Sequence, residues 1–178
     1  AVADHTGFLK NEKGIDAHDL AVYVQQKGGV GGYPKATSVS KEEFYKTKVE
    51  VFIPAALEQM IQEAEAKMIN AVVIAEGANA PTTPAGERIL IERGIEVLPA
   101  ILCNAGGVTV SYFEWVQNKT YQSWDLEHVD RELNKHMVKA ASKTRDARRK
   151  YNCDLRTASY IAACERLNQA YAARGIFP

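Results

Sequence analysis

Two asparagines and a set of small residues stand where a flat ligand could bind. Asn79 and Asn104 each follow a segment expected to form a strand, and their side-chain amides both donate and accept hydrogen bonds. Such amides suit a ribose hydroxyl or a carboxamide, although each asparagine taken alone also fits a plain loop residue. The small residues recur at the same places and would let a ligand approach the backbone: Ala55, Ala56, Gly77, Ala78, Gly106 and Gly107. The pattern therefore indicates a nucleotide-binding site.

Three short apolar segments predict the strands that would hold these residues. They span residues 49–53, 71–75 and 95–99, and the second has the composition of a strand buried on both faces. Helices are expected between them, over 57–69 and from Pro84, where Thr83 caps the first turn and Gly94 follows the last. This alternation predicts a parallel sheet with right-handed crossovers. Ligands of such sheets bind beyond the carboxyl ends of the strands.

The rest of the chain predicts a short strand end at 1–4, a turn-rich loop at 7–14 and mainly helices. One helix is expected from Asp16 through Gln26, and three more over 105–118, 125–151 and 154–174. The last of these has apolar residues close to one face, so we expect it to pack back on the sheet. We therefore divide the chain into a partial dinucleotide-binding domain, 1–104, and a helical extension, 105–178, that lines the cleft.

Composition excludes several functional classes. Lys plus Arg and Asp plus Glu both number 22, so no net field attracts nucleic acid or anionic lipid, and we expect no nucleic-acid partner. No apolar run approaches the ~20 residues of a membrane span, and we expect no membrane association. The 3 cysteines have no paired spacing, which favours a reducing, cytoplasmic setting. The 4 scattered histidines give no metal-binding motif, and no metal site is expected.

Several blocks of sequence resemble one family. "VFIPAALE" (51–58), "EGANAPTTP" (76–84) and "NAGGVTVSYFEWVQN" (104–118) are similar to the coenzyme-binding domain of hexameric glutamate dehydrogenases, within the Glu/Leu/Phe/Val dehydrogenase family. "DLRTASYIAACERL" (154–167), followed by "RGIFP" (174–178), resembles the end of the same family. The resemblance implies an α/β, Rossmann-like doubly wound, mostly parallel sheet with a C-terminal helical extension. It also implies oxidative deamination of L-glutamate to 2-oxoglutarate and ammonia by a homo-hexamer that uses NAD or NADP.

The resemblance also implies roles for individual residues. It places Asn79 at the nicotinamide ribose, Asn104 at the carboxamide, and three residues near the adenosine half of the coenzyme: Ala55, Ala56 and Glu58. It places Val108 against the aliphatic part of the substrate and the Ser111 hydroxyl on its side-chain carboxylate. Gly106 and Gly107 would let the backbone lie close to both ligands. The alternative is that the glycines permit tight helix packing and Ser111 is an ordinary helix residue.

Asp4 resembles the acidic residue that ends the second strand of a dinucleotide fold. There it would accept hydrogen bonds from the adenosine ribose, which favours NAD over NADP because a 2′-phosphate would face a carboxylate. The alternative is an aspartate that serves the turn before Gly7. The first strand and the glycine-rich turn are then expected upstream of Ala1. "KGGVGGYP" (27–34) lacks the third glycine and ends a helix, so we reject it as the phosphate loop.

We therefore interpret the chain as the C-terminal part of a dehydrogenase. The family's catalytic lysine and aspartate belong to a substrate domain that this sequence lacks, so no catalytic residue is expected here and the segment alone should be inactive. The alternatives are a sister leucine, phenylalanine or valine dehydrogenase, or a non-catalytic nucleotide-binding or interaction protein. Three alanines depart from the family's usual glycine, glutamate and aspartate respectively: Ala80, Ala85 and Ala100.

Overall fold

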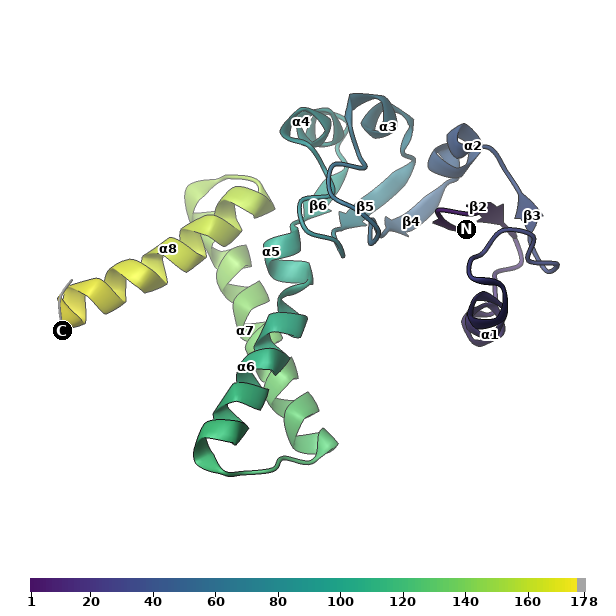
Figure 1. The fold of residues 1–178 in the computed structure, drawn as a ribbon. Coiled ribbons are helices and arrows are strands. Elements are labelled where there is room, and N and C mark those ends of the chain that lie inside the picture. Colours follow the sequence, from purple (N-terminus) through teal and green to yellow (C-terminus); the bar gives the residue numbers. More distant parts are fainter. Residues whose placement is uncertain (176–178) are drawn as a thin grey trace.

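The computed structural model describes residues 1–175, so the last three residues of the "RGIFP" block lie outside the described part. Two small sheets and a set of helices follow one another along the chain (Figure 1). The elements are β1 (Val2–Asp4), β2 (Gly7–Lys10), α1 (Ala17–Lys27), β3 (Thr37–Ser38), α2 (Lys41–Lys46), β4 (Val49–Phe52), α3 (Glu63–Met68), β5 (Ala71–Ala75), α4 (Pro84–Glu92), β6 (Glu96–Leu98), α5 (Ala100–Cys103), α6 (Ala105–Thr120), α7 (Leu126–Tyr151) and α8 (Leu155–Arg174).

The parallel sheet expected from the sequence is present, in the order β4-β5-β6. Helices α3 and α4 lie together over one face of it (Figure 1). Between sheet and helices lies an apolar core whose centre is fully buried and consists of Ile61, Ile69, Ile74 and Leu90. The α/β fold is thereby confirmed. The expectation that residues 71–75 are buried on both faces is wrong at Val72, which is 68% exposed.

A second, antiparallel sheet was not expected. Its order is β1-β2-β3, and Asp4 pairs with Gly7 across the turn between the first two strands. The prediction of a loop over 7–14 is therefore wrong for Gly7–Lys10. Leu9 points into a small separate core with Val30 and Tyr33, and that burial explains why the segment is a strand.

Strands β1 and β4 border the space between the two sheets. Each has a hydrogen-bonded neighbour on one side only within the described residues. Both line a mainly apolar pocket of about 850 Å³. The two sheets are thus separate units that face one cavity rather than one continuous sheet.

Four helices begin where the sequence predicted a helix start. The side chains of Asp16, Thr83, Asp125 and Asp154 each accept a hydrogen bond from a backbone N–H in the first turn of α1, α4, α7 and α8. These starts are confirmed. Helix α4 also begins with Pro84, and Gly94 adopts a left-handed φ of +76° just beyond its end.

The helix expected over residues 57–69 is wrong in its first half. Helix α3 begins only at Glu63. The Ile61 N–H donates to the Pro81 carbonyl (2.9 Å), and Ile61 forms an isolated parallel bridge with Thr82. Hydrogen bonds to a distant loop therefore override the local preference for helix.

The helical half of the chain, residues 105–175, extends away from the sheets. Helices α6 and α7 form a long antiparallel hairpin, and α8 projects past them (Figure 1). Helix α8 packs through its first turns, where Ala158 and Ser159 are buried, whereas every residue from Ala163 to Arg174 is exposed. The expected packing back on the sheet is thus met only at the start of the helix. None of the described helices is long and apolar enough to cross a membrane.

Candidate functional site

Three segments meet at a small pocket beyond the carboxyl ends of β4 and β5. They are the loop after β4, the loop after β5 and the residue that follows α5. The pocket has a volume of about 370 Å³ and is lined by Ala55, Ala56, Leu57, Glu58, Gly77, Ala78, Asn79 and Asn104. All the predicted coenzyme-binding residues except Asp4 therefore come together in one place.

The two asparagines form a hydrogen-bonded pair. Asn104 Nδ2 donates to Asn79 Oδ1 at 2.7 Å and to the Gly77 carbonyl at 3.3 Å. Among the described residues, no hydrogen bond is made by the Asn79 amide nitrogen or by the Asn104 side-chain oxygen. The pair is thus held in position while one donor group and one acceptor group stay available to a ligand.

Close contact between two loops explains part of the small-residue pattern. The N–H groups of Gly77 and Ala78 both donate to the Pro54 carbonyl, at 3.0 and 2.9 Å. A Cβ added at Gly77 would lie 3.1 Å from the Ala55 Cβ, which is tighter than ordinary contact. A side chain at position 77 would therefore require Ala55 to move by a few tenths of an ångström, so the contact between the loops favours glycine there whether or not a ligand binds.

Asp4 lies apart from the asparagines. Its carboxylate accepts hydrogen bonds from the Thr6 N–H (2.7 Å), the Thr6 hydroxyl and the Val30 N–H (2.9 Å). Burial by itself raises the pKa of Asp4, but these hydrogen bonds outweigh it and lower the pKa below its ordinary value. Asp4 lines the 850 Å³ pocket, which shares Ala55, Ala56 and Leu57 with the 370 Å³ pocket that contains the asparagine pair. The carboxylate serves the turn, and its ribose role stays a prediction.

Val108 and Ser111 lie on an open face of α6. Val108 is 70% exposed, and the Ser111 hydroxyl donates to the Gly107 carbonyl one turn earlier at 3.2 Å. A Cβ added at Gly107 would meet nothing within 4 Å, and one at Gly106 would make only an ordinary 3.8 Å contact with Leu133. Tight packing within this chain therefore does not explain Gly107. The substrate roles of Val108 and Ser111 stay predictions.

A buried ionic network next to the pocket was not found from the sequence. Glu76 is fully buried and accepts hydrogen bonds from the Ala100 N–H and from Arg156 Nη2, both at 2.8 Å. Arg156 Nε also contacts both carboxylate oxygens of Glu87, at 2.7 and 2.9 Å. Burial disfavours the charged guanidinium, but the bonds to Glu76 and Glu87 raise the pKa of Arg156. The sequence feature that could have indicated this network is Glu76 itself, a glutamate directly after a predicted strand.

The departures from the family pattern lie in different environments. Ala80 adopts a left-handed φ of +44°, a region that favours glycine. Ala100 is buried, and its N–H is the one bonded to Glu76. Ala85 lies in the first turn of α4.

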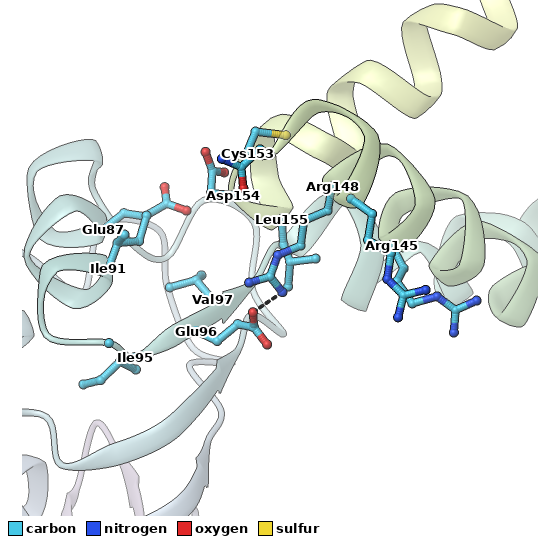
Figure 2. Close-up of a pocket in the computed structure, with 13 residues that line it drawn as sticks. Glu87, Ile91, Ile95, Glu96, Val97, Arg145, Arg148, Cys153, Asp154 and Leu155 are labelled. Atoms are coloured by element: carbon cyan, nitrogen blue, oxygen red, sulfur yellow. Dashed lines mark ion pairs between the residues drawn. The ribbon is translucent and has the colours of Figure 1, made fainter.

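A larger hollow between α4, β6 and the end of α7 does not contribute to this site. It measures about 730 Å³ and shares no lining residue with the asparagine pocket. Arginines of α7 line it, yet Arg148 pairs with Glu96 across it (Figure 2). The charges that line it balance: Arg145, Arg148 and Arg149 against Glu87, Glu96 and Asp154. The described residues also hold no cluster of three or more potential metal ligands.

Comparison with known proteins places this geometry in a family. The model of the glutamate/leucine/phenylalanine/valine dehydrogenases matches residues 1–175. A glutamate dehydrogenase of Thermotoga maritima is 46% identical over 178 residues, which is 100% of this chain and 43% of that protein. An NADP-specific glutamate dehydrogenase of Halobacterium salinarum is 41% identical over 180 residues, covering 100% of this chain and 43% of that protein. An NAD-specific one of Clostridioides difficile is 41% identical over 167 residues, covering 94% and 40%.

Solved structures agree with the sequences. The glutamate dehydrogenase of Peptoniphilus asaccharolyticus superposes with a TM-score of 0.76 at 36% identity, covering 94% of this chain and 37% of that chain. The hetero-hexameric glutamate dehydrogenase of Thermus thermophilus, in its Leu-bound form, gives a TM-score of 0.87 at 26% identity, covering 98% and 41%. The chain thus spans less than half the length of these relatives. It belongs to the glutamate/leucine/phenylalanine/valine dehydrogenase family.

Proposed function

We propose that this chain is the coenzyme-binding, C-terminal part of a longer glutamate dehydrogenase. The observation that supports this most directly is the pocket that gathers Ala55, Ala56, Glu58, Asn79 and Asn104 beyond the strand ends. Small side chains and a fixed asparagine pair suit a flat ligand with ribose and carboxamide groups. The fold places the pocket where open parallel sheets bind nucleotides.

The longer protein would oxidise L-glutamate to 2-oxoglutarate and ammonia. The nicotinamide coenzyme would accept the hydride from the α-carbon of the amino acid. This chain would hold the coenzyme through Asn79 and Asn104, and would direct Val108 and Ser111 to the substrate. The family's proton-transferring lysine and aspartate would come from the other part of the protein.

NAD is the coenzyme we favour. The Asp4 carboxylate is charged at neutral pH, as an ordinary aspartate is, and a charged group near the adenosine end would repel a 2′-phosphate. A glycine-rich turn supplied by the longer protein would bring that end of the coenzyme to Asp4. Relatives include both NAD-specific and NADP-specific enzymes, so the proposal depends on Asp4.

A sister dehydrogenase for leucine, phenylalanine or valine is the second candidate, because the matching family includes all three. Ser111 favours glutamate, since an apolar substrate side chain needs no hydroxyl at that position. We further propose a homo-hexamer, for which the hetero-hexameric Thermus relative supports the number of six subunits but not their identity. We also propose a cytoplasmic setting, in keeping with free cysteines at positions 103, 153 and 164.

Coenzyme titration tests the proposal. In the full-length dehydrogenase that carries this chain, Asn104→Ala should weaken NADH binding about tenfold, because it removes a hydrogen-bonding group and releases Asn79. Binding is measured by NADH fluorescence without glutamate. The control is Gln122→Ala, an exposed amide after α6 that is remote from the pocket lining. Equal NADH affinity in the two variants would reject the coenzyme role of the pocket.

A further inference from the structure

Glu76 ties together the two loops that hold the asparagine pair. It follows β5 directly, and its Oε2 accepts the N–H of Ala100 at the start of α5, 2.8 Å away. The loop after β5 is also bonded to the end of α5, where the Asn104 side chain donates to Asn79 and to the Gly77 carbonyl. The distance between the loops is thus fixed at two points, one inside the protein and one at the pocket.

Arg156 holds the inner tie from a distant part of the chain. It lies in the first turn of α8, 80 residues after Glu76, and donates from Nη2 to Glu76 Oε1 at 2.8 Å. Its Nε bonds Glu87 of α4 at the same time. The fork of the guanidinium therefore clamps the end of β5 to both α4 and α8.

Glu76 depends on this partner because of its burial. Its side chain is 0% exposed, while that of Arg156 is 24% exposed. A buried carboxylate without a cation is strongly unfavourable, so removal of Arg156 leaves Glu76 to seek water or another donor. Movement of Glu76 loosens its bond to Ala100 and, through α5, shifts Asn104 relative to Asn79.

We propose that Arg156 is a positioning residue for coenzyme binding, which acts through Glu76 to fix the Asn79–Asn104 pair. The inference rests on the proposed function, because it assumes that the pair contacts the coenzyme. Arg156 itself touches no ligand in this scheme. Its effect is therefore expected on coenzyme affinity, with little change in turnover once the coenzyme is saturating.

The test uses the full-length dehydrogenase that carries this chain. Arg156→Met should raise the NADH dissociation constant about three- to thirtyfold, while kcat at saturating coenzyme stays within about twofold. Arg156→Lys keeps a cation near Glu76 but loses the fork, so a smaller rise is expected and folding is safer. The matched control is Arg148→Met, which breaks another arginine pair between helix and sheet, with Glu96, away from the asparagines.

A double-mutant cycle separates positioning from general damage to the fold. If Arg156 acts through the pair, Arg156→Met should change NADH affinity less than twofold once Asn104→Ala is present. Effects that multiply instead, or an unchanged NADH affinity in both folded Arg156 variants, would overturn the inference. A lowered melting temperature with no selective loss of NADH affinity would do the same. If Asn104→Ala alone leaves NADH affinity unchanged, the proposed function fails first and the inference falls with it.

Discussion

The two halves of the molecule, residues 1–104 and 105–175, differ in how completely they bury their large apolar side chains. In the sheet half, Ile61, Ile74 and Leu90 are fully buried, and the pocket residues contact one another. In the helical half, Val108 is 70% exposed, Leu167 59% and Trp115 55%. Among the described residues, the largest fully buried side chains all lie in the sheet half, although Leu57 and Val72 are exposed there too, whereas the helical half buries few of its large apolar side chains. The spacing of apolar residues in the sequence does not by itself distinguish buried from exposed side chains.

The largest expected effect is a complete loss of turnover in the isolated chain. If the helical half needs an opposing surface to form the substrate site, the 178-residue chain should produce no NADH from L-glutamate and NAD. The assay follows absorbance of NADH, with the full-length enzyme as the positive control. Turnover by a chain whose mass corresponds to 178 residues would break the comparison.

A matched pair of leucines measures the difference in stability. Leu90→Ala should lower the free energy of unfolding of the chain by ~2–5 kcal/mol, because it empties a fully buried site. Leu167→Ala changes the same side chain on exposed α8 and should alter it by less than ~0.5 kcal/mol. Urea unfolding gives both values. Similar losses at the two positions would mean that α8 is packed in solution.

Ser111 tests whether the exposed face of α6 meets the substrate. In the full-length enzyme, Ser111→Ala should remove a hydrogen bond to a charged group, worth ~1.5–3 kcal/mol. Catalytic efficiency for glutamate should then fall roughly ten- to hundredfold, while that for norvaline, which lacks the carboxylate, changes little. Equal losses for both substrates, with unaltered coenzyme affinity, would return the sister dehydrogenases to contention.

Asp4 tests the edge of the sheet half. In the full-length enzyme, Asp4→Ser should shift the ratio of catalytic efficiencies toward NADP by ~1–2 kcal/mol, roughly tenfold, because repulsion of the 2′-phosphate is lost. Thr6→Val is the control, since it removes the hydroxyl bond to Asp4 and keeps the charge. If both variants shift the ratio equally, the turn and not the carboxylate sets the preference.

Ala80 should give the smallest effect, and in the opposite direction. Its left-handed φ of +44° is strained for alanine, so Ala80→Gly should stabilise the chain by ~0.5–1 kcal/mol. Ala85→Gly, in the first turn of α4, should instead destabilise it by about 0.5–1 kcal/mol. Thermal unfolding compares the two. Destabilisation by both glycines would show that φ at position 80 is not strained in solution.

Local signals in the sequence predicted the elements that depend on local chemistry. Capping by Thr83, the helix start at Asp125 and the apolar run at 71–75 predicted two helix starts and a strand, and the structure confirms all three. The prediction of helix over residues 57–62 was wrong because the backbone of this segment forms hydrogen bonds with a loop some twenty residues later. No local pattern encodes such a partner.

The candidate site divides in the same way. Small residues and asparagines after strands predicted the pocket, because strand ends in a parallel sheet share one edge. The bond between Arg156 and Glu76 joins residues 80 positions apart, so no regular spacing of residues in the sequence predicts it. The turn role of Asp4 was open from the sequence, and its hydrogen bonds from the Thr6 N–H and hydroxyl reveal it.

Helix α8 projects from a root that lies beside Glu76, at the end of β5 (Figure 1). Its root is fixed by Arg156, while residues 163–174 are exposed throughout. Glu165 still bonds Lys150 and Tyr151 at the end of α7. The free arm beyond it is roughly 14 Å long at ~1.5 Å per residue, so a tilt of about 10° at the root moves the tip by about 2 Å. A displacement too small to break the ion pairs at one end is thus magnified at the other.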